Sequence, residues 1–133
     1  MWPSAYLFAV LATVLAVVSA APADIGADAS ENLTLCTNNN FGGVCLAIPI
    51  TPDGCQSFIG GFTIMNKELS SAVIPDGFIC TFFEDFGCLS TGSNGQDEVA
   101  LQGGSFANFA AIPGVFAAQN FDNDASSYSC SVI

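Results

Sequence analysis

The residues of this chain that can do chemistry are twelve carboxylates, six cysteines and one lysine, with no arginine or histidine. Without histidine there is no Ser-His nucleophile pair, and without arginine no guanidinium can stabilise phosphoryl transfer. The remaining catalytic route is a carboxylate pair, for which the candidates are Glu84 with Asp85 and Asp97 with Glu98. Adjacent side chains on a strand point to opposite faces, so neither pair converges by itself. We expect solvated, turn-forming roles for these acids and a protein that is not an enzyme.

The charge balance restricts the partners. Lys67 is the only cationic side chain, and the formal net charge is −11. Nucleic acids and anionic membrane surfaces bind through lysine and arginine, so both are excluded. Cations, basic proteins and neutral glycans are compatible partners, as is an extracellular protein.

The amino-terminal sequence predicts secretion. Residues 1–20 form an apolar run that ends in Val18-Ser19-Ala20, which fits the small-residue rule for signal-peptide cleavage. The run is short for a bilayer span, so we expect no membrane anchor. The mature chain would begin at Ala21 and be extracellular.

Secretion changes how the cysteines are interpreted. Six cysteines in an oxidising compartment predict three disulfides, with fifteen possible pairings and roughly 2–4 kcal/mol of stabilisation each. A cysteine metal site is disfavoured because there is no histidine and no CxxC pair. Asn32 begins the only glycosylation sequon. The six residues are Cys36, Cys45, Cys55, Cys80, Cys88 and Cys130.

The chain beyond the signal peptide predicts an acidic leader followed by one all-β domain. Residues 21–32 are small and acidic without periodicity, which is typical of a flexible segment. Residues 33–133 consist of short runs rich in Thr, Val, Ile and Phe between Gly, Asn, Pro and Asp, the pattern of strands joined by turns.

This domain contains an internal repeat. "LCTNNNFGGVCLAI" opens one half and "ICTFFEDFGCLSTG" the other, and each half finishes with Asn or Asp followed by a double serine. The Asx residues favour turns that start a strand. Two units, at about 33–74 and 75–133, suit two interlocked Greek-key motifs in one sandwich.

The repeated residues resemble the βγ-crystallin domain, and in particular its small secreted microbial and fungal members. The family motif opens with an aromatic-Glu-Asp-x-x-aromatic-x-Gly hairpin and continues to an Asn/Asp-Asn/Asp-x-x-Ser/Thr-Ser segment. In the second half, Phe83-Glu84-Asp85 matches this opening, with Cys88 at the second aromatic position and Ser90 at the glycine.

The first half matches the other end of the hairpin. Phe41-Gly42-Gly43 is similar to the closing Phe-x-Gly, while Cys36 stands at the leading aromatic. Residues 70–85 resemble the family's connection between motifs. The exchange of aromatic residues for cysteine indicates that covalent bridges replace some aromatic packing.

The resemblance implies two calcium sites, each built from the hairpin of one motif and the Asx-Ser loop of the other. Calcium takes six to eight oxygen ligands, including carbonyls and hydroxyls. The site expected to be better comprises Asp122, Asp124, Ser126 and Thr37, and the doubtful one comprises Asn66, Glu68, Ser70 and Glu84. Thr37, Glu84, Glu68 and Asp124 would contribute backbone carbonyls.

The two loops differ in charge. "DNDASS" satisfies the whole family pattern, whereas "NKELSS" places Lys67 beside the doubtful site, where an ammonium would repel a divalent ion. We expect affinities typical of extracellular modules, on the order of 10⁻⁴–10⁻³ M. The resemblance also implies that a serine of each phrase packs on a hairpin. One plausible pairing of the cysteines is Cys36–Cys45, Cys80–Cys88 and Cys55–Cys130.

The predicted function is therefore a stable, secreted, crystallin-like protein with weak calcium binding. A secreted effector, toxin or inhibitor of a foreign hydrolase is the alternative, and an extracellular or spore-coat component without a ligand is a third. The apolar residues 103–121 would be the surface for a protein target. We favour a core role for the large side chains of that stretch, which are Phe106, Phe109, Ile112, Val115, Phe116 and Phe121.

Overall fold

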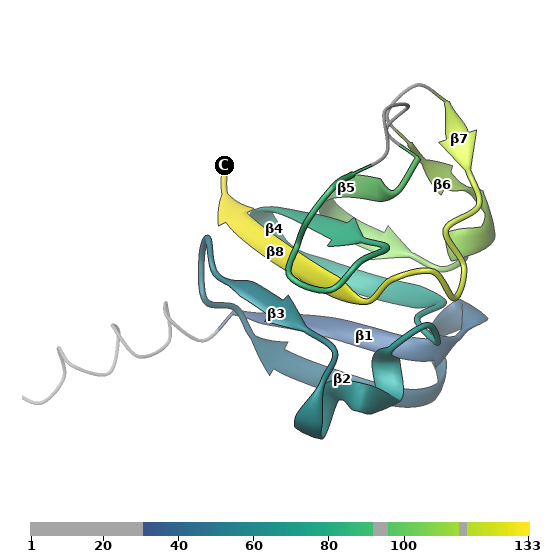
Figure 1. The fold of residues 1–133 in the computed structure, drawn as a ribbon, viewed down its shortest axis with the longest axis horizontal. Helices are drawn as coiled ribbons and strands as arrows, with labels where there is room; N and C mark the ends of the chain where they lie inside the picture. Colours follow the sequence, from purple (N-terminus) through teal and green to yellow (C-terminus); the bar gives the residue numbers. More distant parts are fainter. Residues whose placement is uncertain (1–30, 92–95, 115–116) are drawn as a thin grey trace, which may run out of the picture. The chain divides into compact units, whose positions relative to one another are not determined.

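The computed structural model describes residues 31–91, 96–114 and 117–133. The predicted signal peptide and most of the leader lie outside these residues. Within the described part, no helix is both long and apolar enough to cross a bilayer. The elements are β1 (Asn32–Asn38), η2 (Asn39–Phe41), β2 (Gly42–Pro49), β3 (Cys55–Ser57), η3 (Gly60–Met65), β4 (Ser71–Phe83), β5 (Glu98–Phe106), η4 (Phe109–Ala111), β6 (Ile112–Pro113), β7 (Ala118–Gln119) and β8 (Ser127–Val132) (Figure 1).

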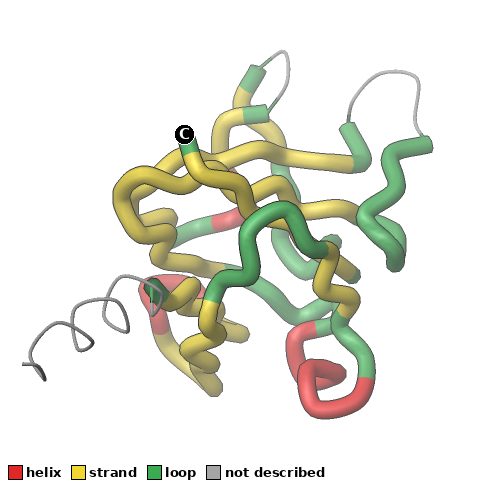
Figure 2. Tube along the Cα trace, turned by 90° about the vertical axis from the view of Figure 1, so that its left-hand side faces the viewer, coloured by secondary structure: helices red, strands yellow, loops and turns green. Residues whose placement is uncertain are grey.

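The strands form antiparallel sheets, which confirms the predicted all-β class. The main sheet has the order β2-β1-β4-β8-β3, and β5 also pairs with β4. A small second sheet joins β6 to β7. Within residues 31–91, 96–114 and 117–133, helical backbone is confined to the short 3-10 segments η2, η3 and η4, of which η3 is the longest (Figure 2).

Strand β4 belongs to both halves of the repeat. Its first residues pair with β1, and its last residues pair with β8. The pairing of β4 with β5 shifts register between Ile74 and Ile79, where Gly77 has a φ of 88°. In the first half, β3 pairs with β8 of the second half instead of with its own neighbours. The two motifs are thus interlocked by exchange of strands.

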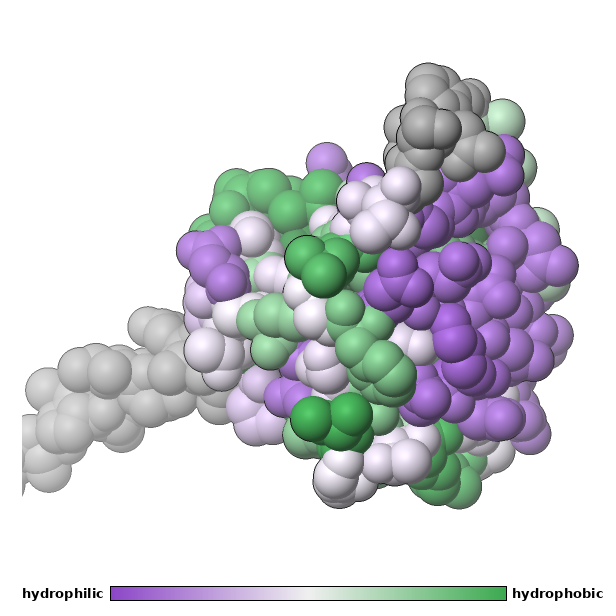
Figure 3. All heavy atoms as spheres, in the orientation of Figure 1, coloured by the Kyte–Doolittle hydropathy of each residue, from purple (hydrophilic) through white to green (hydrophobic). Residues whose placement is uncertain are grey.

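The core is aromatic and aliphatic. Phe82 is fully buried, and its ring centroid lies 5.6 Å from that of Phe109 and 5.9 Å from that of Tyr128. Phe109, Ile112 and Phe121 are buried and Phe106 packs against the core. The predicted core role is therefore confirmed for these four residues, while Val115 and Phe116 lie outside the described part. On the face drawn in Figure 3, hydrophilic side chains gather toward the end at which β1 finishes.

All six cysteines are paired, as predicted. Cys36–Cys45 links directly opposed positions of β1 and β2 and matches the expected pairing. The other two expected pairs are wrong, because the structure contains Cys80–Cys130 and Cys55–Cys88. Cys80 and Cys130 oppose each other on β4 and β8, with 4.0 Å between their Cα atoms. Three bridges indicate an oxidising compartment.

Strand exchange explains the bridge between Cys55 and Cys88. Cys88 follows the turn of the second hairpin, where the Gly87 amide donates to Ser57 Oγ over 2.9 Å. Ser57 belongs to β3, the strand that the first half contributes to β8. Cys55, at the start of the same strand, therefore meets Cys88 and ties the two halves together.

Tyr128 gives the core a pH-dependent reporter. Burial raises the pKa of its phenol to about 12. Because the ordinary value is 10.0, the unfolded chain releases this proton first as the pH rises, and the native state loses stability between the two values. We expect ultraviolet absorbance of the mature protein to show late phenol ionisation together with a falling melting temperature above pH 10. In Tyr128→Phe, the part of the fall in melting temperature that comes from this phenol should be absent. If the melting temperature still falls by the same amount above pH 10, another group causes the loss of stability.

Candidate functional site

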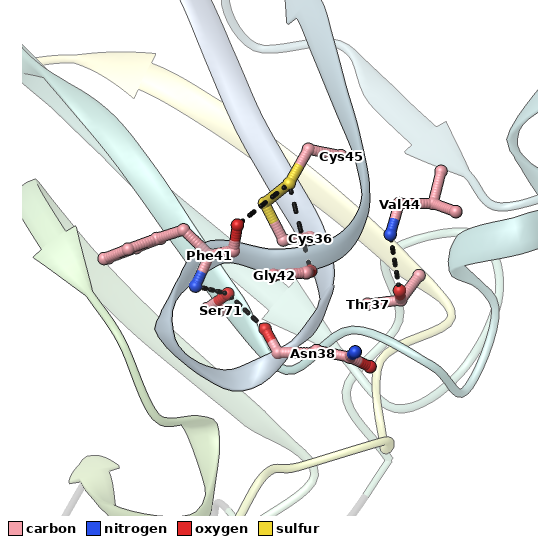
Figure 4. Close-up of a disulfide and its surroundings, with 8 residues drawn as sticks. All are labelled: Cys36, Thr37, Asn38, Phe41, Gly42, Val44, Cys45 and Ser71. Carbon is pink, nitrogen blue, oxygen red and sulfur yellow. Dashed lines mark hydrogen bonds between the residues drawn. A yellow bond between two sulfur atoms is a disulfide. The ribbon is translucent and has the colours of Figure 1, made fainter.

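Each double serine pins a folded hairpin. In the first half, Ser71 Oγ donates to the Asn38 carbonyl over 2.6 Å and accepts from the Phe41 amide over 3.0 Å (Figure 4). In the second half, Ser127 Oγ donates to the Asp85 carbonyl over 2.6 Å and accepts from the Cys88 amide over 2.9 Å. Both serines are fully buried. The architectural interpretation of the repeated phrase is confirmed, and it falls on the second serine of each pair.

The two hairpins share one backbone conformation. Phe41 and Cys88 occupy equivalent positions and have positive φ angles of 61° and 56°. Left-handed backbone is unusual for such residues, so its occurrence at both positions marks one turn design used twice. This equivalence makes Thr37 of the first hairpin the counterpart of Glu84 of the second, as the resemblance to the family motif implied.

The two Asx-Ser loops lie side by side in a two-fold arrangement. The Lys67 amide donates to the Ala125 carbonyl over 2.9 Å, and the Asn123 amide donates to the Leu69 carbonyl over 3.1 Å. Lys67 and Asn123, the second residues of their loops, both have positive φ, at 59° and 61°. Positions 66 and 122, 68 and 124, and 70 and 126 are therefore structural counterparts.

Lys67 crosses from its own loop to the other half. Its Nζ donates to the Glu84 carbonyl over 2.7 Å and to the Asp124 carbonyl over 2.7 Å. These two oxygens were expected in different sites, but the structure brings both to a single ammonium. The hairpin and the loop of the second half thus face one position together, and the lysine of the first half fills it.

The remaining candidate ligands are distributed over both loops. Ser70 Oγ donates to Asn123 Oδ1 over 3.3 Å, and Ser126 is buried. Glu68 is exposed and Thr37 is partly buried, with Thr37 Oγ1 accepting from the Val44 amide (Figure 4). Their places in the loops and the first hairpin are those expected, but their role as ligands stays a prediction.

Two buried oxygens lack a donor. Asn66 Oδ1 and Asp122 Oδ1 are both shielded from solvent and have no hydrogen-bond partner in the described residues. They occupy the first, equivalent position of each loop. An unpaired buried oxygen is costly, and a cation can satisfy it. No cluster of three or more His, Cys, Asp or Glu was found among the described residues, so an ion here would depend on carbonyl, amide and hydroxyl oxygens.

The electrostatics of the second loop favour a nearby positive charge. Burial raises the pKa of the Asp124 carboxyl, the positive charge of Lys67 opposes that rise, and the negative charge of Asp122 adds to it. Folding therefore makes the charged form of Asp124 less favourable, and a cation beside the loop offsets this cost.

Two of the four acids considered as catalytic candidates, Asp85 and Asp97, bond to turn residues, whereas Glu98 begins strand β5. Asp97 accepts hydrogen bonds from Ser90 Oγ over 2.9 Å and from the Thr91 amide over 2.6 Å. Asp85 accepts from Thr91 Oγ1 over 3.3 Å. The turn-forming role is confirmed for both, but the expected solvation of Asp97 is wrong, because its side chain is buried.

Comparison with solved structures supports the fold described above, whereas sequence comparisons found no relative. Scans against family sequence models and against curated proteins found no match. Among solved structures, a βγ-crystallin domain from Clostridium beijerinckii, in a double-mutant form, superposes with a TM-score of 0.55 at 17% identity, covering 77% of this chain and 98% of that one. A βγ-crystallin from Ciona intestinalis gives a TM-score of 0.52 at 19% identity, covering 74% and 96%.

A third structure contains a metal. A clostrillin variant with two serines changed to histidine, in complex with nickel, gives a TM-score of 0.54 at 15% identity and covers 77% of this chain and 99% of that one. Likeness at these identities concerns the fold. Together with the two pinned hairpins and the paired Asx-Ser loops, it shows that this chain has the βγ-crystallin fold.

Proposed function

We propose that this protein is a secreted, non-enzymatic βγ-crystallin-fold domain that binds one calcium ion weakly at its first hairpin. The fold and the three disulfides support a domain built to persist in an oxidising, extracellular setting. The nickel complex of the clostrillin variant supports the general point that a domain of this fold can carry a metal.

The observation that carries the proposal is that two carbonyls of the second half converge on one cation, whereas the equivalent position of the first half has no lysine. Asn66, whose Oδ1 is buried and unpaired as that of Asp122 also is, begins the loop that belongs to the first hairpin. In the second half, the Glu84 and Asp124 carbonyls converge on one cation. From the two-fold equivalence we infer that the carbonyls of Thr37 and Glu68 face a matching position in the first half. There the neutral Asn123 stands where the second half has Lys67, so a calcium ion meets no ammonium.

This assignment reverses the order of the two sites expected from the sequence. The loop with two aspartates appeared better because it lacks a lysine of its own. The side chain of Lys67, however, reaches the carbonyls of that second loop and its hairpin rather than those next to it in sequence. We therefore assign the calcium ion to the half that no lysine occupies, at the first hairpin, with Thr37, Glu68 and Asn66.

The test is a series of thermal melts of the mature, oxidised protein in EDTA, in calcium and in magnesium. At about 10 mM calcium, a dissociation constant on the order of 10⁻⁴–10⁻³ M predicts about 1.4–2.7 kcal/mol of stabilisation. We expect a saturable rise with calcium and a much smaller one with magnesium. A melting temperature that does not respond to calcium would contradict the proposal.

Two variants locate the ion. Asn66→Ala removes the unpaired oxygen of the first loop and should abolish the calcium response. Asp122→Ala removes the equivalent oxygen of the second loop and serves as the matched control, with a response close to that of the unchanged protein. Loss of the response in the control alone would place the ion in the second loop instead.

A further inference from the structure

We infer that Lys67 is a built-in cation, which occupies the ion position of the second half and makes that half independent of metal. This inference goes beyond the proposed function, because it holds whether or not the first hairpin binds calcium. It rests on where the ammonium lies and on what surrounds it.

The geometry of the ammonium resembles that of a bound ion. Its two carbonyl partners, Glu84 and Asp124, lie at 2.7 Å. Calcium-oxygen distances are about 2.3–2.6 Å, so the carbonyls need to move only slightly to hold a metal at the same place. An ammonium has three donors and no acceptor, which suits it to a position lined by oxygens.

The choice of partners is informative. Lys67 is the only cationic side chain in a chain with twelve acids, so a freely placed surface lysine would have many carboxylates to pair with. In the described residues, its ammonium donates instead to two backbone carbonyls, from residues 40 positions apart in sequence. Backbone carbonyls of a hairpin and an adjacent loop are ligands for hard cations.

The contact also connects separate chain segments, as a bound ion would. Lys67 lies in the loop of the first motif, Glu84 in the hairpin of the second and Asp124 in the loop of the second. One ammonium therefore joins three segments and both motifs at this end of the fold. A bound metal would make such a connection only when the ion is available, whereas the covalently attached lysine makes it at all times.

The experiment compares Lys67→Met and Lys67→Asn with the unchanged protein. Lys67 has a left-handed φ of 59°, which methionine tolerates as poorly as lysine but asparagine adopts readily. Stability in EDTA is therefore judged on the methionine variant, and calcium binding on the asparagine variant. Gln102→Glu, at an exposed position of β5, lowers the net charge by one as Lys67→Met does and is the matched control.

In EDTA we expect Lys67→Met to lower the melting temperature by about 4–8 °C, and the charge control to lower it by less than half as much. In calcium, Lys67→Asn should bind one more ion per chain than the unchanged protein in a calorimetric titration. Lys67→Arg, which keeps the charge, should gain no ion and covers the case in which the neutral variants do not fold.

Two results would overturn the inference. A melting temperature of Lys67→Met equal to that of the charge control would mean that the ammonium does not hold the segments together. A calcium stoichiometry of Lys67→Asn equal to that of the unchanged protein would mean that the carbonyl pair is no ion position. The response of the unchanged protein tests the first hairpin, and the gain in the variant tests the second, so the two proposals fail separately.

Discussion

Replacing Cys80 and Cys130 together with alanine is expected to lower the free energy of unfolding by about 4 kcal/mol. The bridge spans 50 residues and therefore restricts the unfolded chain more than the other two, which span 9 and 33. Both sulfurs also lie in the core, where their side chains are at most 1% exposed. Urea denaturation of the unchanged protein and the variant, followed by fluorescence or circular dichroism, measures the difference.

The bridge between Cys36 and Cys45 provides the matched control. It joins opposed positions of two neighbouring strands, as the core bridge does, but closes a loop of only 9 residues. The same double replacement there should cost about 2.5 kcal/mol. Equal losses in the two variants would show that loop length does not govern the contribution of these bridges. A steeper dependence on urea is expected for both variants, because their unfolded chains expose more surface.

The pairing of these cysteines marks the limit of what the sequence could predict. An even number of cysteines behind a predicted signal peptide was enough to indicate that all six are bridged. The partner of Cys80 depends on which strands neighbour β4, and those neighbours come from distant parts of the chain. Hairpin proximity therefore identified Cys36–Cys45 correctly but misled for Cys88, whose neighbour β3 arrives by strand exchange.

The fold was easier to predict from the sequence than the cysteine pairing, because the motifs that indicate it are local and occur twice. The Phe-x-Gly and double-serine phrases specify a turn and the hydroxyl that pins it, and neither needs a knowledge of distant contacts. Their repetition at matching separations then indicated two copies of one motif. The same locality explains why Phe109, Ile112 and Phe121 could be assigned to the core from the apolar pattern around them.

The candidate site was predicted only in part. The loop residues could be named from the sequence, but the reach of Lys67 could not. The lysine carries four methylenes, and its neighbours in sequence suggested that it disturbs its own loop. The antiparallel arrangement of the loops, set by the bonds from Lys67 to Ala125 and from Asn123 to Leu69, turns the side chain toward the other half. The sequence shows that residue 67 is positively charged, but it does not show toward which half its side chain points.

The second large effect is expected for Ser127→Ala, which should lower the free energy of unfolding by about 2–6 kcal/mol. The change removes the hydroxyl that bonds both the Asp85 carbonyl and the Cys88 amide. These two backbone groups then lose their partner, a hydroxyl whose residue is fully buried. The cost of an unpaired buried group, about 1–3 kcal/mol, applies to each of them.

Two further serines make this prediction specific. Ser71→Ala removes the equivalent bonds of the first hairpin and should cost a similar amount, because the two turns share one geometry. Ser131→Ala, on the same strand as Ser127, removes only an exposed bond to Asp53 and should cost under about 0.5 kcal/mol. Urea denaturation of all three variants compares them directly. If Ser131→Ala lowered the free energy of unfolding as much as the other two changes, the buried serines would contribute no more than any serine of the strand. The repeated phrase would then have to be explained by ion binding alone.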